Sequence, residues 1–74
     1  MGLTMKPREM INFLTANGYT FVRAKNGSHH IYSNGAVTVP VPIHEGREFD
    51  EKFIRLVLHE TGISKSELLT FLKR

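Results

Sequence analysis

The chain has 74 residues, no cysteine and a formal net charge of +3 with histidine neutral. We expect a single domain, residues 1–74, because either half would be too small to bury a hydrophobic core. The lack of cysteine excludes disulfides, a thiolate nucleophile and cysteine-ligated zinc, and it fits a reducing cytoplasm, where we expect the protein to act. No apolar run approaches the roughly 20 residues of a membrane helix, so no membrane partner is expected.

The excess positive charge lies in the first half of the chain. Residues 35–74 hold six cations and six anions, whereas residues 1–34 hold four cations and one anion, namely Lys6, Arg8, Arg23, Lys25 and Glu9. A basic region of this kind favours a polyanion such as RNA as the partner. A basic face that is merely solvated is the plainer alternative.

A first helix is predicted over residues 5–16. Met10, Ile11 and Leu14 recur at helical spacing, and Thr4 can cap the helix. Pro7 is tolerated in a first turn. The pair at residues 17–18, Asn-Gly, is expected to end the helix, since glycine accepts the left-handed backbone of a helix stop.

Three short β-rich runs follow, which are Tyr19 to Lys25, Ser28 to Ser33 and Ala36 to Val41. Asn-Gly pairs at residues 26–27 and 34–35 separate them, and such pairs favour two-residue type I′ turns. The sequence therefore predicts a three-stranded antiparallel meander. Simple alternation groups Tyr19, Phe21 and Arg23 on one face of the first strand.

The third strand is expected at an edge of the sheet, because Pro40 and Pro42 cannot donate hydrogen bonds to a further strand.

A second helix is predicted after Asp50, which can cap it, and before Gly62, which can end it. Its apolar stripe consists of Phe53, Ile54, Val57 and Leu58. A capping box over residues 64–67 predicts a short C-terminal helix.

The predicted fold is α+β, in the order α-β-β-β-α with a short C-terminal helix. It places helices on one face of a three-stranded antiparallel sheet and leaves the other face to solvent or a ligand. This is the order of the double-stranded-RNA-binding domain, which reads duplex RNA by shape and phosphate contacts. Fold alone does not give function.

An adjacent histidine pair, His29 and His30, is the best candidate for proton transfer in a chain without cysteine. Histidine as a residue type both takes and gives a proton near neutral pH. Strand alternation points the two rings to opposite faces. One histidine shares a face with Ile31, which we expect to lean toward the core, and the other shares a face with Ser28 and Tyr32. The sequence leaves open which is which, and an edge position at a turn leaves either histidine accessible. Two ordinary strand residues are the plainer alternative.

No metal or cofactor is expected. His44 lies in the connector after the third strand, and His59, late in the second helix, is most simply a partner of the helix dipole. The histidine spacings follow no metal-binding motif, and there is no glycine-rich phosphate loop.

A series of short motifs resembles the HicA toxin family over residues 6–69. The motifs are Asn17-Gly18-Tyr19, Val22-Arg23, Lys25, Gly27-Ser28-His29-His30-Ile31-Tyr32, Val39-Pro40, His44, Gly46, Glu48, Ile54-Arg55, Leu58 and Gly62-Ile63-Ser64. Two departures affect a turn and a helix cap. An extra Asn precedes Gly27, and the second helix begins Asp50-Glu51-Lys52-Phe53 where the family often has Pro-Gly-Thr-Leu.

The resemblance implies the toxin of a type II toxin–antitoxin system. Such toxins are metal-independent endoribonucleases that cleave mRNA and are silenced by a HicB-like antitoxin. The single catalytic histidine of the family falls on His29, with His30 as the alternative. Arg23, Lys25 and Ser28 are then expected to bind RNA. The competing hypotheses are a non-catalytic RNA-binding module and a domain whose basic face docks an acidic protein.

Overall fold

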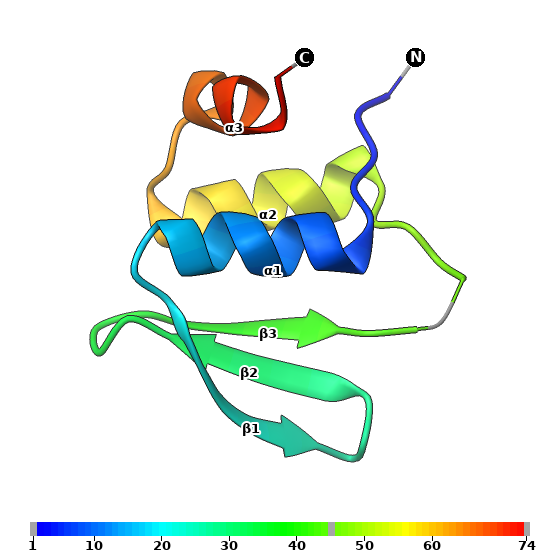
Figure 1. Ribbon diagram of the computed structural model, residues 1–74, viewed down its shortest axis with the longest axis vertical. Coiled ribbons are helices and arrows are strands. Elements are labelled where there is room, and N and C mark those ends of the chain that lie inside the picture. Colours follow the sequence, from blue (N-terminus) through cyan, green and yellow to red (C-terminus); the bar gives the residue numbers. More distant parts are fainter. Residues whose placement is uncertain (1, 45, 74) are drawn as a thin grey trace.

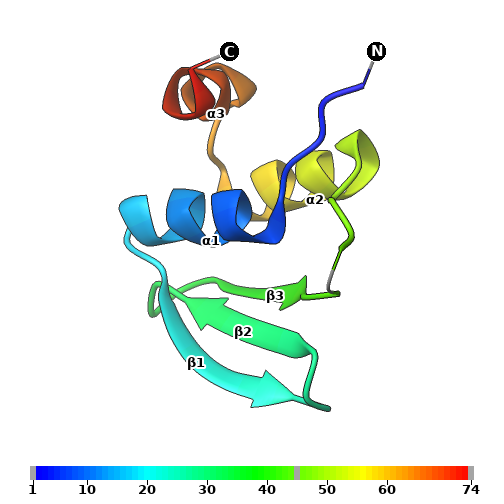
Figure 2. The same ribbon diagram turned by 45° about the vertical axis from the view of Figure 1, so that its right-hand side comes forward.

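The computed structural model describes residues 2–44 and 46–73, which fold into one sheet and three helices. The elements are α1 (Pro7–Ala16), β1 (Thr20–Lys25), β2 (His29–Ser33), β3 (Thr38–Pro42), α2 (Glu51–Thr61) and α3 (Lys65–Leu72). Helices α1 and α2 lie side by side over one face of the sheet, and α3 lies beyond them, on the side away from the sheet (Figures 1 and 2). The predicted α+β order and the one-sided helix cover are confirmed.

The sheet is an antiparallel meander with β2 in the centre. Strand β1 pairs with β2, and β2 pairs with β3, so β3 lies at an edge as its prolines predict. Pro42 of β3 lies opposite His29, and Val41 lies opposite His30. These pairings fix which side chains surround the two histidines.

The two Asn-Gly turns connect the strands as predicted, but neither is a two-residue turn. Asn26 and Gly27 both have positive φ, at 54° and 76°, yet Lys25 pairs with His29, so three residues make the connection. The second connection has four residues. There the side-chain oxygen of Asn34 accepts hydrogen bonds from the N–H groups of residues 36 and 37, at 2.9 and 2.7 Å, and this Asx turn replaces the type I′ geometry.

Helix α1 begins two residues later than predicted, and Thr4 is not its cap. The reason is a short β-bridge between Met5 and Phe49, whose N–H groups donate to each other's carbonyls at 3.1 and 2.7 Å. This bridge keeps residue 5 extended, and Lys6 becomes the N-cap. The predicted caps of α2 and α3 are confirmed, since Asp50 accepts from the N–H of residue 53 and Ser64 from that of residue 67.

The core lies between the helix pair and one face of the sheet. That face contributes Tyr32, Val39 and Val41, which are all buried. The helices and the segments next to them contribute the other large buried side chains, which include Met5, Met10, Phe13, Leu14, Ile54, Val57 and Leu68. Burial also raises the pKa of the Tyr32 phenol. We call the opposite face of the sheet, which no helix covers, the outer face (Figure 2).

Glu51, the first residue of α2, joins three parts of the chain. Its carboxylate accepts hydrogen bonds from the N–H of Leu3 at 3.0 Å and from the guanidinium of Arg55 at 2.5 Å, and Lys65 lies 3.9 Å away. The Leu3 hydrogen bond first, and then these two cations, hold the pKa of the Glu51 carboxyl below its ordinary value of 4.5.

We expect Glu51→Gln to lower the thermal midpoint by a few degrees near neutral pH and by less in acid. A carboxyl with a lowered folded-state pKa stabilises the fold above its unfolded-state pKa, and this contribution is lost as the pH falls through the folded value. Thermal unfolding at about pH 7 and about pH 3 measures the difference. Glu60→Gln, on the same helix, is the control, and an equal Glu51→Gln effect at both pH values would contradict the assignment.

Candidate functional site

The outer face carries a shallow hollow around His29, which we call the His29 hollow. Its volume is about 380 Å³, and its lining consists of Arg23, Lys25, Asn26, His29, Ile31, Thr38 and Pro40. The strand register explains this set, because Lys25 lies opposite His29, and both Arg23 and Pro40 lie opposite Ile31. Two cations and one imidazole therefore share one open surface.

A β-bulge at Val22 brings the two cations to this face. Phe21 pairs with Tyr32 and Arg23 pairs with Ile31, so Val22 is an extra residue on β1. Such an insertion flips every later side chain of the strand to the other face. The predicted grouping of Phe21 with Arg23 on one face is therefore wrong, and the bulge is what puts Arg23 and Lys25 beside His29.

The two histidines have different surroundings. His29 is exposed on the outer face, whereas His30 is half-buried on the helix-covered face. There the rings of His30 and Phe21 make an edge-to-face contact, with their centroids 5.5 Å apart. The expectation that the Ile31 face leans toward the core is wrong. Tyr32 is buried in the core cluster with Val39 and Val41 of β3. Ile31 is only 8% exposed, but it lies outside that cluster and lines the His29 hollow.

The charges in the His29 hollow are not neutralised by neighbours. Among residues 2–44 and 46–73, the side chains of Arg23, Lys25 and His29 form no hydrogen bond or ion pair. None of the described residues that line the hollow is a carboxylate. Two uncompensated cations give this surface a positive potential, which attracts an anion such as a phosphate group.

Ser28, expected from the sequence to bind RNA, does not line the His29 hollow. Its side chain is half-buried at the turn, and its carbonyl accepts a hydrogen bond of 2.7 Å from the N–H of Ile43. Through this bond Ser28 fixes the position of the chain just after β3. The structure thus brings together Arg23, Lys25 and His29, and leaves Ser28 and His30 outside their hollow.

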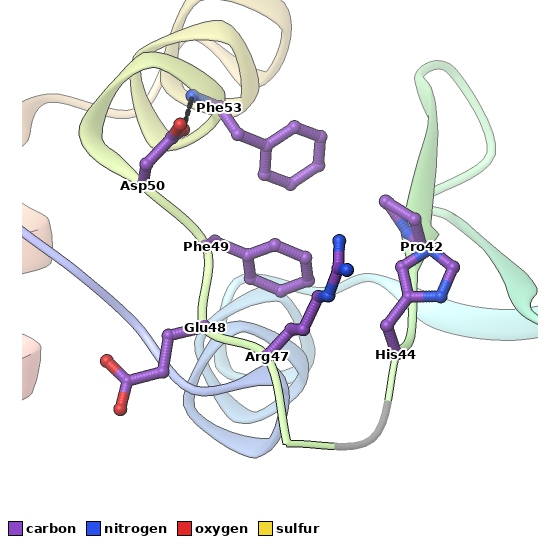
Figure 3. A pocket seen from close by; sticks show the side chains of 7 residues that line it. All are labelled: Pro42, His44, Arg47, Glu48, Phe49, Asp50 and Phe53. Carbon is purple, nitrogen blue, oxygen red and sulfur yellow. Dashed lines mark hydrogen bonds between the residues drawn. The ribbon is translucent and has the colours of Figure 1, made fainter.

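A second hollow of about 240 Å³ lies between the end of β3 and the start of α2 (Figure 3), and we call it the Arg47 hollow. Pro42, His44, Arg47, Glu48, Phe49, Asp50 and Phe53 line it. The side chains of His44 and Arg47 point into it, and Glu48 points away (Figure 3). Sequence reasoning did not select Arg47, because no local motif marks it and only the folded connector places it beside these aromatic rings.

Two further observations concern other classes of site. The described part of the chain holds no cluster of three or more His, Asp or Glu side chains that could bind a metal ion. None of the helices that the structure describes is both long enough and apolar enough to cross a membrane. His59 lies in the last turn of α2, where its position suits the helix dipole.

Comparison with known protein families gives a match over most of the chain. A family model described as "HicA toxin of bacterial toxin-antitoxin" matches residues 7–63, which are 57 of the 74 residues. The matched span runs from α1 to the residue before the cap of α3, and it contains every residue that lines the two hollows. Comparisons with curated proteins and with solved structures give no match.

Proposed function

The chain belongs to the HicA toxin family, and on that premise we propose that it is a metal-independent endoribonuclease that cleaves mRNA with His29 as general acid and base. Family membership makes the protein the toxin of a toxin–antitoxin pair and implies a cognate antitoxin. The observation that supports a nuclease site is the His29 hollow, in which an exposed imidazole lies beside two cations that form no ion pair with any described residue.

RNA supplies its own nucleophile, so the protein has little chemistry to add. The 2′-hydroxyl attacks the adjacent phosphorus, the bond from phosphorus to the 5′-oxygen breaks, and a cyclic phosphate and a 5′-hydroxyl form. His29 takes the proton from the 2′-hydroxyl and returns it to the leaving 5′-oxygen. Arg23 and Lys25 stabilise the charge that develops on the phosphate oxygens.

His30 is the alternative catalytic residue, and its surroundings argue against it. Its ring is half-buried on the face under the helices and packs against Phe21. Neither of the residues opposite His30, Ala24 and Val41, is a cation that could bind a phosphate. We therefore assign proton transfer to His29.

The experiment that tests this function is cleavage of a mixed-sequence RNA by the purified protein in EDTA. We expect fragments that carry a cyclic phosphate at one new end and a hydroxyl at the other. Binding without cleavage would favour the non-catalytic RNA-binding module, and cleavage only with an added metal ion would contradict the mechanism. A protein that binds only an acidic protein partner would have neither activity.

We expect Arg23→Glu and Lys25→Glu to weaken the binding of both RNA and a HicB-like antitoxin, by about tenfold or more at low salt. The reason is that the antitoxin covers the His29 hollow and excludes RNA from it. Charge steering should also make antitoxin association slower as salt rises. Titration of each partner against each variant measures this, with Lys73→Glu on the opposite side of the molecule as the control. A stable ternary complex with His29 still accessible would contradict steric exclusion.

A further inference from the structure

We infer that His44 and Arg47 form a second RNA subsite, which holds a nucleotide next to the phosphate that His29 cleaves. This inference rests on the proposed function, because it extends the surface along which the same RNA strand lies. It assigns the Arg47 hollow a ligand of definite chemistry, namely one phosphate and one base of single-stranded RNA.

The register of the sheet places the two hollows side by side. Pro42, which lines the Arg47 hollow, lies directly opposite His29 on the neighbouring strand. The hydrogen bond from the N–H of Ile43 to the carbonyl of Ser28, at 2.7 Å, continues the pairing one residue beyond β3. His44 is therefore two residues past the partner of His29. An RNA strand that leaves His29 across Pro42 reaches His44 next.

Arg47 is available to bind an anion. Its side chain forms no hydrogen bond or ion pair with the residues that the structure describes. The carboxylate of Glu48 points away from it (Figure 3). The other carboxylate of the hollow, Asp50, is occupied, because it accepts the 2.9 Å hydrogen bond from the N–H of Phe53 that caps α2. A guanidinium in these surroundings suits a phosphate, which accepts two parallel hydrogen bonds from it.

The rest of the lining favours a nucleotide over an acidic peptide. The half-buried ring of Phe53 lies at one side of the hollow and packs against the buried ring of Phe49, with the two ring centroids 4.8 Å apart and an angle of 33° between the planes. Aromatic rings and guanidinium planes are the surfaces on which the bases of single-stranded nucleic acids stack. The imidazole of His44 is a further planar group on the opposite side (Figure 3). An acidic peptide would use the charge and leave these rings unused.

The positive surface continues past Arg47 toward the start of α1. Arg47 also lines an adjoining hollow together with Lys6, Pro7, Arg8, Gly46 and Glu48. This adjoining hollow therefore has three cations and one carboxylate in its lining, and it extends the cationic surface from the Arg47 hollow to the start of α1. A surface of this kind fits several successive phosphates and exceeds what one scissile phosphate needs.

The test is binding of a ten-nucleotide 2′-O-methyl RNA, which lacks the attacking hydroxyl, to the full chain and its variants. We expect Arg47→Ala to weaken binding about tenfold at low salt, as for loss of a hydrogen bond to a charged group. The slope of log K against log salt should fall by about 0.7, the value for one phosphate contact on a single strand. His44→Ala should also weaken binding of the 2′-O-methyl RNA. On unmodified RNA, Arg47→Ala should raise KM and leave kcat unchanged.

Lys73→Ala, which removes a cation at the C-cap of α3, is the matched control and should leave binding and the salt slope unchanged. If Arg47→Ala binds and cleaves RNA like the wild type, the subsite is overturned while the assignment of His29 stands. If Arg47→Ala weakens antitoxin binding and leaves RNA binding unchanged, the hollow is a protein interface and the inference is again overturned. A wild-type protein that neither binds nor cleaves RNA would overturn the proposed function itself.

Discussion

Replacing His29 with alanine is expected to lower the rate of RNA cleavage by about 10²–10⁴-fold, the usual contribution of a positioned acid or base. The imidazole lies in a hollow with two cations, and none of the described residues that line it is a carboxylate that could take over the proton transfer. The fold should survive with a stability change of no more than about 1–2 kcal/mol, because the ring is exposed on the outer face. Initial cleavage rates in EDTA, with circular dichroism of the same samples, measure both effects.

His30→Ala is the matched control, since it removes the same ring one residue later on the same strand. It should keep most of the cleavage activity and lose some stability, because the half-buried ring packs against Phe21. Loss of activity in His30→Ala with retention in His29→Ala would move the catalytic assignment by one residue. Retention in both variants would refute a catalytic histidine in this pair.

Leu68→Ala is expected to cost about 2–5 kcal/mol of unfolding free energy, the range for truncating a fully buried leucine. Leu68 is 0% exposed although α3 lies after residue 63, where the family match ends. An edge-to-face contact of 5.5 Å between Phe71 of α3 and Phe13 of α1 adds to the same packing. For a domain of this size the expected cost is a large part of the total stability, which is about 4–11 kcal/mol at the usual value per residue.

Urea unfolding of Leu68→Ala measures this cost, and Leu69→Ala, at a half-buried neighbouring position, is the control that should cost less. A change in Leu68→Ala as small as that of an exposed substitution, within about 0.5 kcal/mol, would show that α3 does not contribute to the core. The expected result makes α3 an integral part of the domain.

The parts of the fold that sequence analysis predicts correctly are those encoded by neighbouring residues. Asn26-Gly27 marks a turn, Pro40 and Pro42 mark an edge strand, and Asp50 and Gly62 mark the ends of α2. Each is a local property of the backbone or of a capping side chain, so the chain order alone reveals it. The family resemblance is likewise carried by motifs in a fixed order, and the family model confirms it.

The parts that could not be predicted depend on contacts between distant residues. The bulge at Val22 exists only in the pairing of β1 with β2, and a plain alternation pattern groups Arg23 with Phe21 instead of with His29. The bridge from Met5 to Phe49 displaces the predicted cap at Thr4 for the same reason. Arg47 meets the rings of Phe49 and Phe53 only after the connector has folded back. Both the orientation of the cations in the candidate site and its extension along β3 are therefore tertiary features.

The most direct measurement of the central claim compares wild-type cleavage of two RNAs of identical sequence in EDTA, one unmodified and one with 2′-O-methyl groups throughout. If RNA supplies the nucleophile and His29 moves its proton, the unmodified RNA is cut, and the methylated RNA binds to the protein but stays intact. Equal cleavage of both RNAs would show that the nucleophile is not the 2′-hydroxyl, and it would contradict the account of His29.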